Sequence, residues 1–210
     1  SRGLGDVYKR QTLDLSKALI HKGHESFVIS GGGILVDELE QLGAKHYEIP
    51  VHIKSLRTLS LAKSLSETIS SIDPDIVHIR SRMPAWVNYR AFKMLQKKPL
   101  LVSTFHGLYS FPIYSKVMSF VDHSIAISKT VEKYILENYK LNKDDITVIP
   151  RGCDPIEFNN ESINPNDKAR IFSELPQING KKVLTIPGRI TKWKGISEFI
   201  ELISLLDAVS

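Results

Sequence analysis

The sequence predicts an α/β fold with a doubly wound parallel sheet, and three observations support this prediction. Short runs of β-branched residues alternate with segments of helical periodicity along most of the chain. The order of strand, helix and strand repeats several times, which is typical of a parallel sheet covered by helices on both faces. The composition, with 42% hydrophobic and 24% charged residues, excludes a disordered chain, a collagen-like fibre and a coiled coil.

Turn residues and changes of periodicity give the bounds of each element. Gly23 ends the first helix, three glycines follow the first strand, and Asp73-Pro74 closes a long amphipathic helix. The elements expected before residue 80 are, in order, a helix from residue 12, a strand over 26–30, a helix over 35–42, a strand over 44–49, a helix over 56–72 and a strand over 75–79. The later elements are strands over 100–105 and 123–127, each followed by a helix, the second of them over 129–138, then strands over 146–149 and 183–186 and a helix over 195–206.

The length of 210 residues allows one full domain and part of a second. We expect a first domain over 12–155, because the polar, turn-rich segment that follows breaks the alternation of strands and helices. Residues 156–180 are expected to form a linker with a short helix that ends before Pro176. Residues 181–210 would then be the first strand and helix of an incomplete second domain.

Residues 1–11 contain no Met and no apolar periodicity, so we interpret them as a non-native or replaced N-terminus and exclude them from the fold prediction. They supply +2 of the net charge of +5, which leaves +3 for the rest of the chain. Such mild basicity, without Lys and Arg clustered on one element, argues against nucleic-acid binding.

The cysteine content and hydropathy bear on the compartment. Cys153 is the single cysteine, so the chain cannot form an internal disulfide, which fits a reducing environment. No segment approaches the about 18 consecutive apolar residues that a membrane helix needs. We therefore expect a cytoplasmic protein, with peripheral association at a membrane surface as an additional expectation.

Unusual residues follow four of the predicted strands. In an open parallel sheet, ligands bind beyond the carboxyl ends of the strands, where helix N-termini present free N–H groups. Because these ends share one edge of the sheet, we expect a binding site there. Its candidate residues are Gly31, Gly32, Gly33, Arg80, Arg82, His106, Gly107 and Ser128.

Most of these candidates also have a purely structural interpretation. The glycine triplet is equally consistent with a loop and with close backbone approach to a ligand. Arg80 and Arg82 suit an anionic group, although pairing with a helix carboxylate is the alternative. Ser128 is most simply a helix N-cap, which would still leave neighbouring N–H groups for an anion. His78 lies inside its strand and is interpreted as a core residue.

His106 is the strongest candidate of the first domain. An imidazole with a pKa near 6.5 can donate to a sugar hydroxyl or a phosphate, and Gly107 beside it leaves room for a substrate. The alternative is a histidine bonded to its own turn. Cys153 is too isolated from any base to be a nucleophile, and no His, Cys, Asp and Glu cluster has metal-ligand spacing.

A second candidate site follows the last predicted strand. Gly188, Arg189 and Lys194 precede a helix, so a guanidinium and an ammonium would lie beside a helix N-terminus, which suits a diphosphate. Lys192 and Trp193 are interpreted as a solvent-facing and a packing residue. The glycine motifs of P-loop and dinucleotide-binding proteins are missing from the positions where they would be needed.

Five stretches, in this order and spacing, resemble the retaining glycosyltransferases of family 4, which have the GT-B fold of two facing Rossmann-like domains. They are Leu15 to Ser30 with Lys22-Gly23-His24-Glu25, Thr104 to Gly107, Asp122 to Ser128, Val148 to Asp154, and Gly188-Arg189 spaced to Lys194-Gly195. The resemblance extends from about Thr12 to Leu206. Residues 80–86 and 105–109 further resemble a bacterial branch associated with lipopolysaccharide core or other envelope sugars.

The resemblance implies a hexosyltransferase-type enzyme whose first domain binds the acceptor and whose second binds a nucleoside diphosphate sugar. Arg189 and Lys194 align with the family's basic pair, which with Gly188 would hold the departing diphosphate, so neither a metal ion nor another cofactor is expected. His106 aligns with the histidine that contacts the transferred sugar. The implied partners are a nucleotide-sugar donor, a saccharide or lipid-linked acceptor and the inner-membrane surface. Further acceptor or sugar contacts are expected from Arg80, Arg82, Gly107 and Ser128.

Three features depart from the family pattern. Residues 1–11 stand where the family has a strand and a glycine-rich loop. The paired glutamates that hold the donor lie further downstream in the family, and Glu198 and Glu201 have the wrong spacing to replace them. Arg151 stands where asparagine is more usual, as an added anion contact or a surface charge. We therefore expect a fragment truncated at both ends and inactive or nearly so on its own.

Two other functions remain open at this point. One is a module that binds an envelope saccharide or a nucleotide without turnover. The other is a GT-B nucleotide-sugar epimerase, which would need an acid/base pair, whereas the sequence offers only His106. Turnover of a sugar nucleotide distinguishes a transferase from a binding module.

Overall fold

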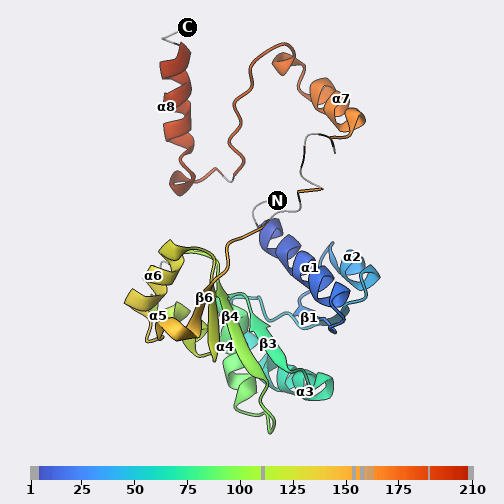
Figure 1. Cartoon of the computed structure of the whole chain (residues 1–210), viewed down its shortest axis with the longest axis vertical. Helices are drawn as coiled ribbons and strands as arrows, with labels where there is room; N and C mark the ends of the chain where they lie inside the picture. Colours follow the sequence, from blue (N-terminus) through green and yellow to red (C-terminus); the bar gives the residue numbers. More distant parts are fainter. Residues whose placement is uncertain are drawn as a thin grey trace. The chain divides into compact units, whose positions relative to one another are not determined.

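The structure, a computed structural model, describes residues 5–109, 112–152, 155–156, 159, 161, 163–188 and 190–207. It divides into two units, one of Leu15–Gly152 and one of Ser1–Asp14 with Cys153–Ser210. All strands that the structure describes lie in the first unit (Figure 1). The candidate residues of the strand ends therefore belong to one unit, and those of the diphosphate loop to the other.

The strands form two parallel sheets, which confirms the α/β prediction but not a single hydrogen-bonded sheet. The smaller sheet pairs β1 with β2, and the larger has the order β3-β4-β5-β6. Within the described residues, the strands of the smaller sheet are not hydrogen-bonded to those of the larger sheet. The strands are β1 (Phe27–Ser30), β2 (Lys45–Glu48), β3 (Ile76–Ile79), β4 (Leu100–Phe105), β5 (His123–Ala126) and β6 (Ile146–Val148).

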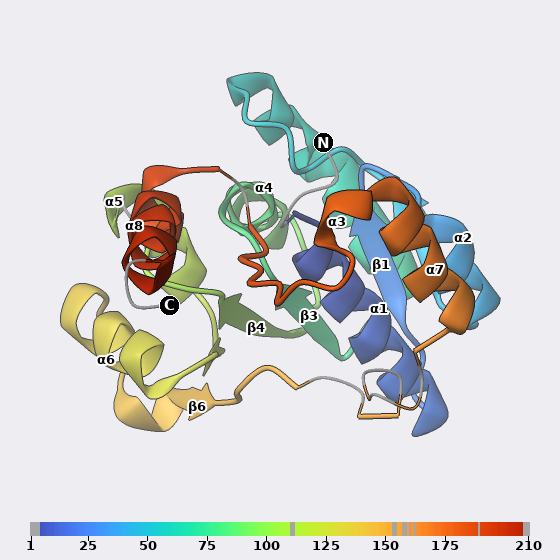
Figure 2. The same ribbon diagram turned by 90° about the horizontal axis from the view of Figure 1, so that it is seen from above.

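Helices connect the strands, and β3 and β4 lie side by side in both ribbon views (Figure 2). The first helix, α1 (Gly5–His21), precedes β1. The elements between strands are α2 (Val36–Gln41), η1 (Leu56–Leu61), α3 (Ala62–Ile72), α4 (Arg82–Phe92), α5 (Pro112–Ser115), η2 (Lys116–Ser119), α6 (Lys129–Asn138) and η3 (Lys143–Asp145). Among these helices, α2 packs against β2, and α6 packs against β5 and β6.

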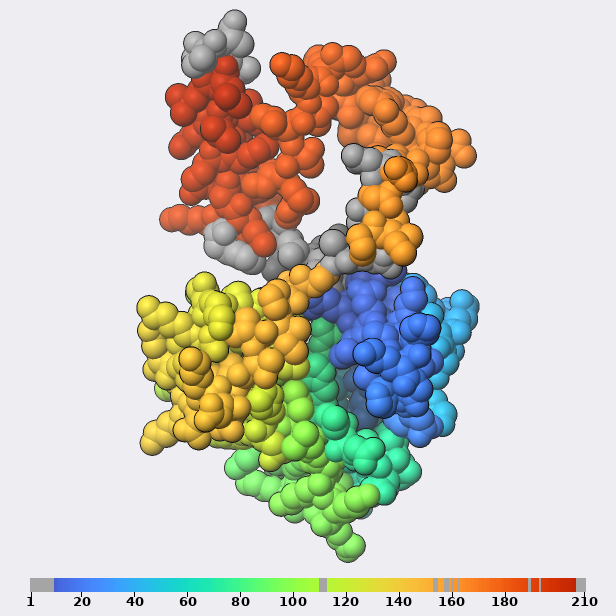
Figure 3. Space-filling model, viewed as in Figure 1, coloured from blue at the N-terminus to red at the C-terminus, as the bar shows by residue number. Residues whose placement is uncertain are grey.

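Two clusters of buried side chains hold this unit together. One lies around β4 and β5 and includes Phe105, Met118 and Ile135, all fully buried. The other lies where α3 packs against α4, and the teal and green atoms of this region are in contact in the space-filling view (Figure 3). Phe105 is the last residue of β4, so the first cluster fixes the end of the strand from which the candidate histidine follows.

Helix ends follow the predicted turn chemistry. Ser128 caps α6 by accepting a hydrogen bond from the N–H of Val131 at 3.2 Å. Asp73 ends α3 in the left-handed conformation with φ of 49°, and its carboxylate accepts a hydrogen bond from Lys97 Nζ at 2.7 Å. Both caps satisfy backbone groups that a helix end leaves open.

Two features differ from the fold that the sequence predicts. Residues 5–11, which were left out of the fold prediction, form the first turns of α1. Their interpretation as a non-native or replaced N-terminus stays a prediction. Residues 183–186 form no strand: Val183 and Leu184 are 52% and 57% exposed, and no described strand of that unit offers a ladder for them. A β-branched run becomes a strand only when a neighbour accepts its backbone hydrogen bonds.

The second unit consists of helices and connecting segments in its described part. They are α7 (Pro165–Glu174), η5 (Pro176–Ile178), η6 (Lys192–Lys194) and α8 (Ile196–Asp207). Pro165 begins α7 directly after the N-cap Asn164, whose side chain accepts a hydrogen bond from the N–H of Asn166 at 2.9 Å. Gly195, with φ of 71°, makes the turn between η6 and α8.

Candidate functional site

The carboxyl ends of β3, β4 and β6 bring three cationic or ionisable side chains together. Arg80 follows β3, His106 follows β4, and Arg151 follows β6. Strands in a parallel sheet end at the same edge, so residues far apart in the chain become neighbours there. We call the set of Arg80, His106 and Arg151 the rim site.

His106 is half-buried, and both arginines of the rim site are near enough to affect the pKa of its side chain. Burial lowers the pKa of its imidazole to about 3, and the positive charges of Arg80 and Arg151 act in the same direction. His78 contributes a smaller lowering. The imidazole is therefore neutral at neutral pH, with one ring nitrogen able to donate a hydrogen bond and the other able to accept one.

Arg151 is bound directly to the loop that carries His106. Its Nη2 donates a hydrogen bond to the His106 carbonyl oxygen at 3.2 Å. The sequence left this arginine open between an anion contact and a surface charge. It lies three residues after the end of β6, so the rule that identified Arg80 directly after β3 includes Arg151 only when it is extended past Ile149 and Pro150.

Arg82 is held between two aromatic rings next to the rim site. Its guanidinium carbon lies 4.9 Å from the centroid of Tyr109 and 5.3 Å from that of Tyr114. Its Nη1 donates a hydrogen bond to Ser115 Oγ at 3.4 Å. The Tyr109 hydroxyl in turn accepts a hydrogen bond from the His106 N–H at 3.5 Å. Arg82 therefore joins α4 to the loop after β4 through cation–π contacts.

The glycine candidates are explained differently by the structure. A Cβ at Gly31 would overlap the His52 ring, while Gly32 and Gly33 have φ of 75° and 136°. Local packing and backbone conformation thus account for this triplet, as the loop interpretation expects. A Cβ at Gly107 would meet no atom within 4 Å. Open space therefore lies at Gly107, the residue for which the sequence analysis expected room for a substrate.

The hydroxyl of Ser128 is hydrogen-bonded to the first turn of α6. It caps α6, so the structural interpretation of this residue is confirmed. His78 likewise has a structural bond, because its Nε2 lies 2.7 Å from Thr104 Oγ1 on the neighbouring strand. Burial, and then the charge of Arg80, lower the pKa of His78 to about 4.

The lowered pKa of His78 predicts acid sensitivity of the fold. A histidine in the unfolded chain binds a proton near pH 6.5, whereas folded His78 stays neutral until about pH 4. The unfolded state thus binds more protons in this window, so the stability present above pH 6.5 is lost on acidification, by about 1 kcal/mol per pH unit. We expect His78→Gln to reduce this slope, measured by urea unfolding at about pH 7 and about pH 5. Equal slopes for the two proteins would contradict the assignment.

The loop of the second unit brings two of its three candidates together. A Cβ at Gly188 would lie 3.9 Å from the side-chain carbons of Lys194, so the lysine stem runs along this glycine. Lys194 is the last residue of η6 and lies two residues before the start of α8. Arg189 lies outside the described residues.

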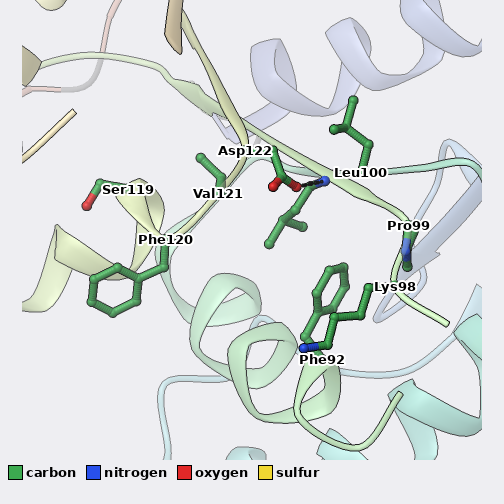
Figure 4. Close-up of a pocket in the computed structure, with 9 residues that line it drawn as sticks. Phe92, Lys98, Pro99, Leu100, Ser119, Phe120, Val121 and Asp122 are labelled. Atoms are coloured by element: carbon green, nitrogen blue, oxygen red, sulfur yellow. Dashed lines mark hydrogen bonds between the residues drawn. The ribbon is translucent and has the colours of Figure 1, made fainter. Parts of the chain in front are cut away.

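A cavity lies at the amino ends of the strands, away from the carboxyl ends that carry the rim site. It has a volume of about 540 Å³ and lies between the starts of β4 and β5, lined by Lys98, Leu100, Phe120 and Asp122 among others. Figure 4 shows the Asp122 carboxylate accepting a hydrogen bond from the Leu101 N–H, at 2.7 Å. This carboxylate is already used to join two strands, so we assign the cavity no chemistry.

The described residues were also compared with the requirements of a metal site and of a membrane-spanning helix. Within these ranges no group of three or more His, Cys, Asp and Glu residues could hold a metal ion. None of the helices in the described part of the chain is long and apolar enough to cross a bilayer.

Comparisons with known proteins agree on one family. The sequence model of Glycosyltransferase Family 4 matches residues 9–157. An uncharacterized glycosyltransferase from Methanocaldococcus jannaschii is 30% identical over 148 residues, which are 62% of this chain and 36% of that protein.

Solved structures show the same fold. A glycosyltransferase from Rickettsia africae is 33% identical with a TM-score of 0.75, over 94% of this chain and 53% of that one. Anabaena HepE, solved with UDP and glucose, is 16% identical with a TM-score of 0.69, over 98% and 55% of the two chains. The lipopolysaccharide outer core galactosyltransferase WaaB is 17% identical with a TM-score of 0.54, over 68% and 42%. The chain thus spans between about a third and about half of the length of these relatives.

Proposed function

The chain belongs to glycosyltransferase family 4, and on this premise we propose that the protein transfers a sugar from a nucleoside diphosphate sugar to a saccharide or lipid-linked acceptor. The observation that carries the proposal is the rim site, in which a neutral imidazole and two guanidinium groups follow strands of one sheet. Transfer is proposed to proceed with retention of the anomeric configuration, as the resemblance implies.

His106 is proposed to contact the transferred sugar. A neutral imidazole can donate one hydrogen bond to a sugar hydroxyl and accept another, which an imidazolium cannot do. A Cβ at Gly107 would meet no atom within 4 Å, so there is open space at the residue that follows His106. Arg80 and Arg151 would attract an anionic group of the bound substrate to the same edge.

Lys194, Arg189 and Gly188 are proposed to bind the donor diphosphate. The lysine stem packs along Gly188, so the ammonium group is carried on the same short loop as Arg189. Positive charges of this kind stabilise the negative charge that develops on a departing diphosphate, and they do so without a metal ion. We therefore propose a metal-independent reaction.

An envelope saccharide or lipid is the proposed acceptor. The fold likeness to WaaB supports this choice, because that protein is described as a lipopolysaccharide outer core galactosyltransferase. Peripheral association with the inner membrane belongs to the same proposal, since a lipid-linked acceptor is held at a bilayer surface.

An epimerase is the second candidate, because a UDP-N-acetylglucosamine 2-epimerase from Rickettsia bellii shares the fold at 13% identity and a TM-score of 0.50. Epimerisation needs a paired acid and base. Among the described residues, the groups that shift the pKa of His106 are Arg80, Arg151 and His78, and none of these is a carboxylate. The rim site therefore favours transfer over epimerisation.

Release of nucleoside diphosphate tests the proposal. The full-length protein is incubated with common sugar nucleotides and a membrane extract, with and without EDTA. We expect one donor to be consumed, to the same extent in both conditions, with its sugar recovered on a larger product. A protein that leaves every donor intact would be a binding module, and one that returns an isomeric sugar nucleotide would be an epimerase.

A further inference from the structure

A second cavity of the unit 15–152 lies beside the rim site and has no part in the chemistry described so far. Its volume of about 430 Å³ is within the range of about 300–1,000 Å³ that is usual for small-molecule sites. We call it the apolar groove. Its walls come from η1 and the residues before it, from α4 and from α5, and include Lys54, Leu56, Leu59, Met83, Trp86 and Tyr114.

The polar side-chain atoms of Trp86, Tyr114 and Ser55 in these walls are already hydrogen-bonded within the protein. Trp86 Nε1 donates to the Tyr114 carbonyl at 3.0 Å, and the Tyr114 hydroxyl donates to Met83 Sδ at 3.6 Å. The Ser55 hydroxyl accepts a bond from the Arg57 N–H at 3.2 Å. The groove therefore offers hydrocarbon surface, which suits an aliphatic chain better than the hydroxyl groups of a sugar.

Large apolar side chains are exposed around the groove. Leu56, on its wall, is 87% exposed, and Ile113, next to Tyr114 in the chain, is 89% exposed. Exposed apolar residues that gather at a cavity indicate a binding surface, whereas scattered ones do not. Covering them would gain the free energy of removing hydrocarbon from water.

One end of the groove carries a positive charge. Lys54 lines the cavity and is exposed, and it forms no ion pair with any residue in the described part of the chain. A hydrocarbon lining with a cation beside it is complementary to an amphiphile, which has an aliphatic chain and an anionic head.

A continuous series of contacts joins the groove to the rim site. Tyr114 forms a wall of the groove and stacks on Trp86, with ring centroids 6.5 Å apart. The guanidinium of Arg82 lies between Tyr114 and Tyr109. The Tyr109 hydroxyl accepts the hydrogen bond of the His106 N–H. A molecule bound in the groove is thus adjacent to the residues that lead to the transfer chemistry.

We propose that the apolar groove binds the aliphatic chain of a lipid-linked acceptor, whose anionic head pairs with Lys54 and whose sugar extends towards Arg82 and the rim site. The proposal deepens the proposed function, because it names the class of acceptor and the surface that holds it. The lining favours this occupant over a free saccharide, since Leu56, Leu59 and Met83 offer no hydrogen bond to a hydroxyl group.

Binding of a soluble alkyl phosphate tests the groove without sugar transfer. A bromine-terminated dodecyl phosphate, used below the concentration at which it forms micelles, is titrated into the full chain carrying Trp193→Phe. We expect it to quench the fluorescence of Trp86, with an affinity that rises with chain length, and inorganic phosphate to cause no quenching. Leu56→Asp should weaken binding about tenfold or more, because it places a charge on the apolar wall.

Ile34→Asp is the matched control, since Ile34 is 80% exposed and lies outside the lining of the groove. The affinity of this variant for the alkyl phosphate should equal that of the parent protein. Undiminished binding by Leu56→Asp, or affinity independent of chain length, would overturn the proposal. Binding to vesicles of phosphatidylglycerol without quenching by the monomeric probe would assign the surface to the bilayer instead. Self-association abolished by Leu56→Asp, again without quenching, would assign it to a second copy. Because no donor is present, these results are independent of whether the protein proves to be a transferase.

Discussion

Replacing Arg189 with alanine should slow sugar transfer by the full-length enzyme about a hundredfold. In the proposed reaction the bond between the sugar and the diphosphate breaks, and negative charge builds up on the departing oxygen. Removing one cation aimed at such a charge costs about 3 kcal/mol of transition-state stabilisation. Because the interaction strengthens as the charge develops, most of the loss should appear in kcat rather than in KM for the donor.

Lys192→Ala provides the matched control for this prediction. Lys192 is an exposed cation of the same loop, three residues from Arg189 in the chain, and the sequence analysis assigned it to solvent. We expect its steady-state rate to stay within about twofold of the parent protein. An unchanged rate for Arg189→Ala would remove this arginine from the site, and equal losses for the two variants would indicate a general effect of charge.

Phe105→Ala should lower the free energy of unfolding by about 4 kcal/mol. Phe105 is completely buried at the end of β4, and its ring centroid lies 5.5 Å from that of Tyr109 and 5.4 Å from that of Tyr139. Truncating it leaves a cavity that the paired strands cannot close. Urea unfolding followed by fluorescence measures the loss.

Phe120→Ala separates this effect from the loss of any aromatic ring. Phe120 is 39% exposed, and its ring is tilted against that of Tyr89 with the centroids 5.2 Å apart, so its removal should cost roughly 1 kcal/mol. If Phe105→Ala leaves no folded protein, Phe105→Leu should still unfold cooperatively with a smaller loss. A loss for Phe105→Ala no greater than that for Phe120→Ala would contradict the assignment of Phe105 to the core.

The sequence predicted those parts of the fold that depend on local chemistry. The bounds of β4 and α6 agree with the prediction, and Ser128 caps α6 as its residue type and position indicate. Arg80 and His106 were found because the parallel-strand rule converts a place in the sequence into a place at the sheet edge. These inferences needed only periodicity, turn residues and one topological rule.

Other features could not be derived from local patterns alone. The sequence places Arg151 shortly after a strand, but its bond to the His106 carbonyl joins residues 45 positions apart and is not part of any local pattern. The run over 183–186 has the composition of a strand, but a strand also needs a paired neighbour. Residues 5–11 are helical because they continue into α1, although they show no apolar periodicity of their own.

Titration of the His106 imidazole by NMR tests the rim site most directly. The resonance is assigned by its loss in His106→Gln, which keeps a polar side chain at the position. We expect the His106 ring to stay neutral down to about pH 5, because burial and the charges of Arg80 and Arg151 lower its pKa to about 3. A midpoint near pH 6.5, the ordinary value for histidine, would contradict it. The ring would then be solvated and remote from both arginines, and the arrangement on which the proposed transfer depends would be absent.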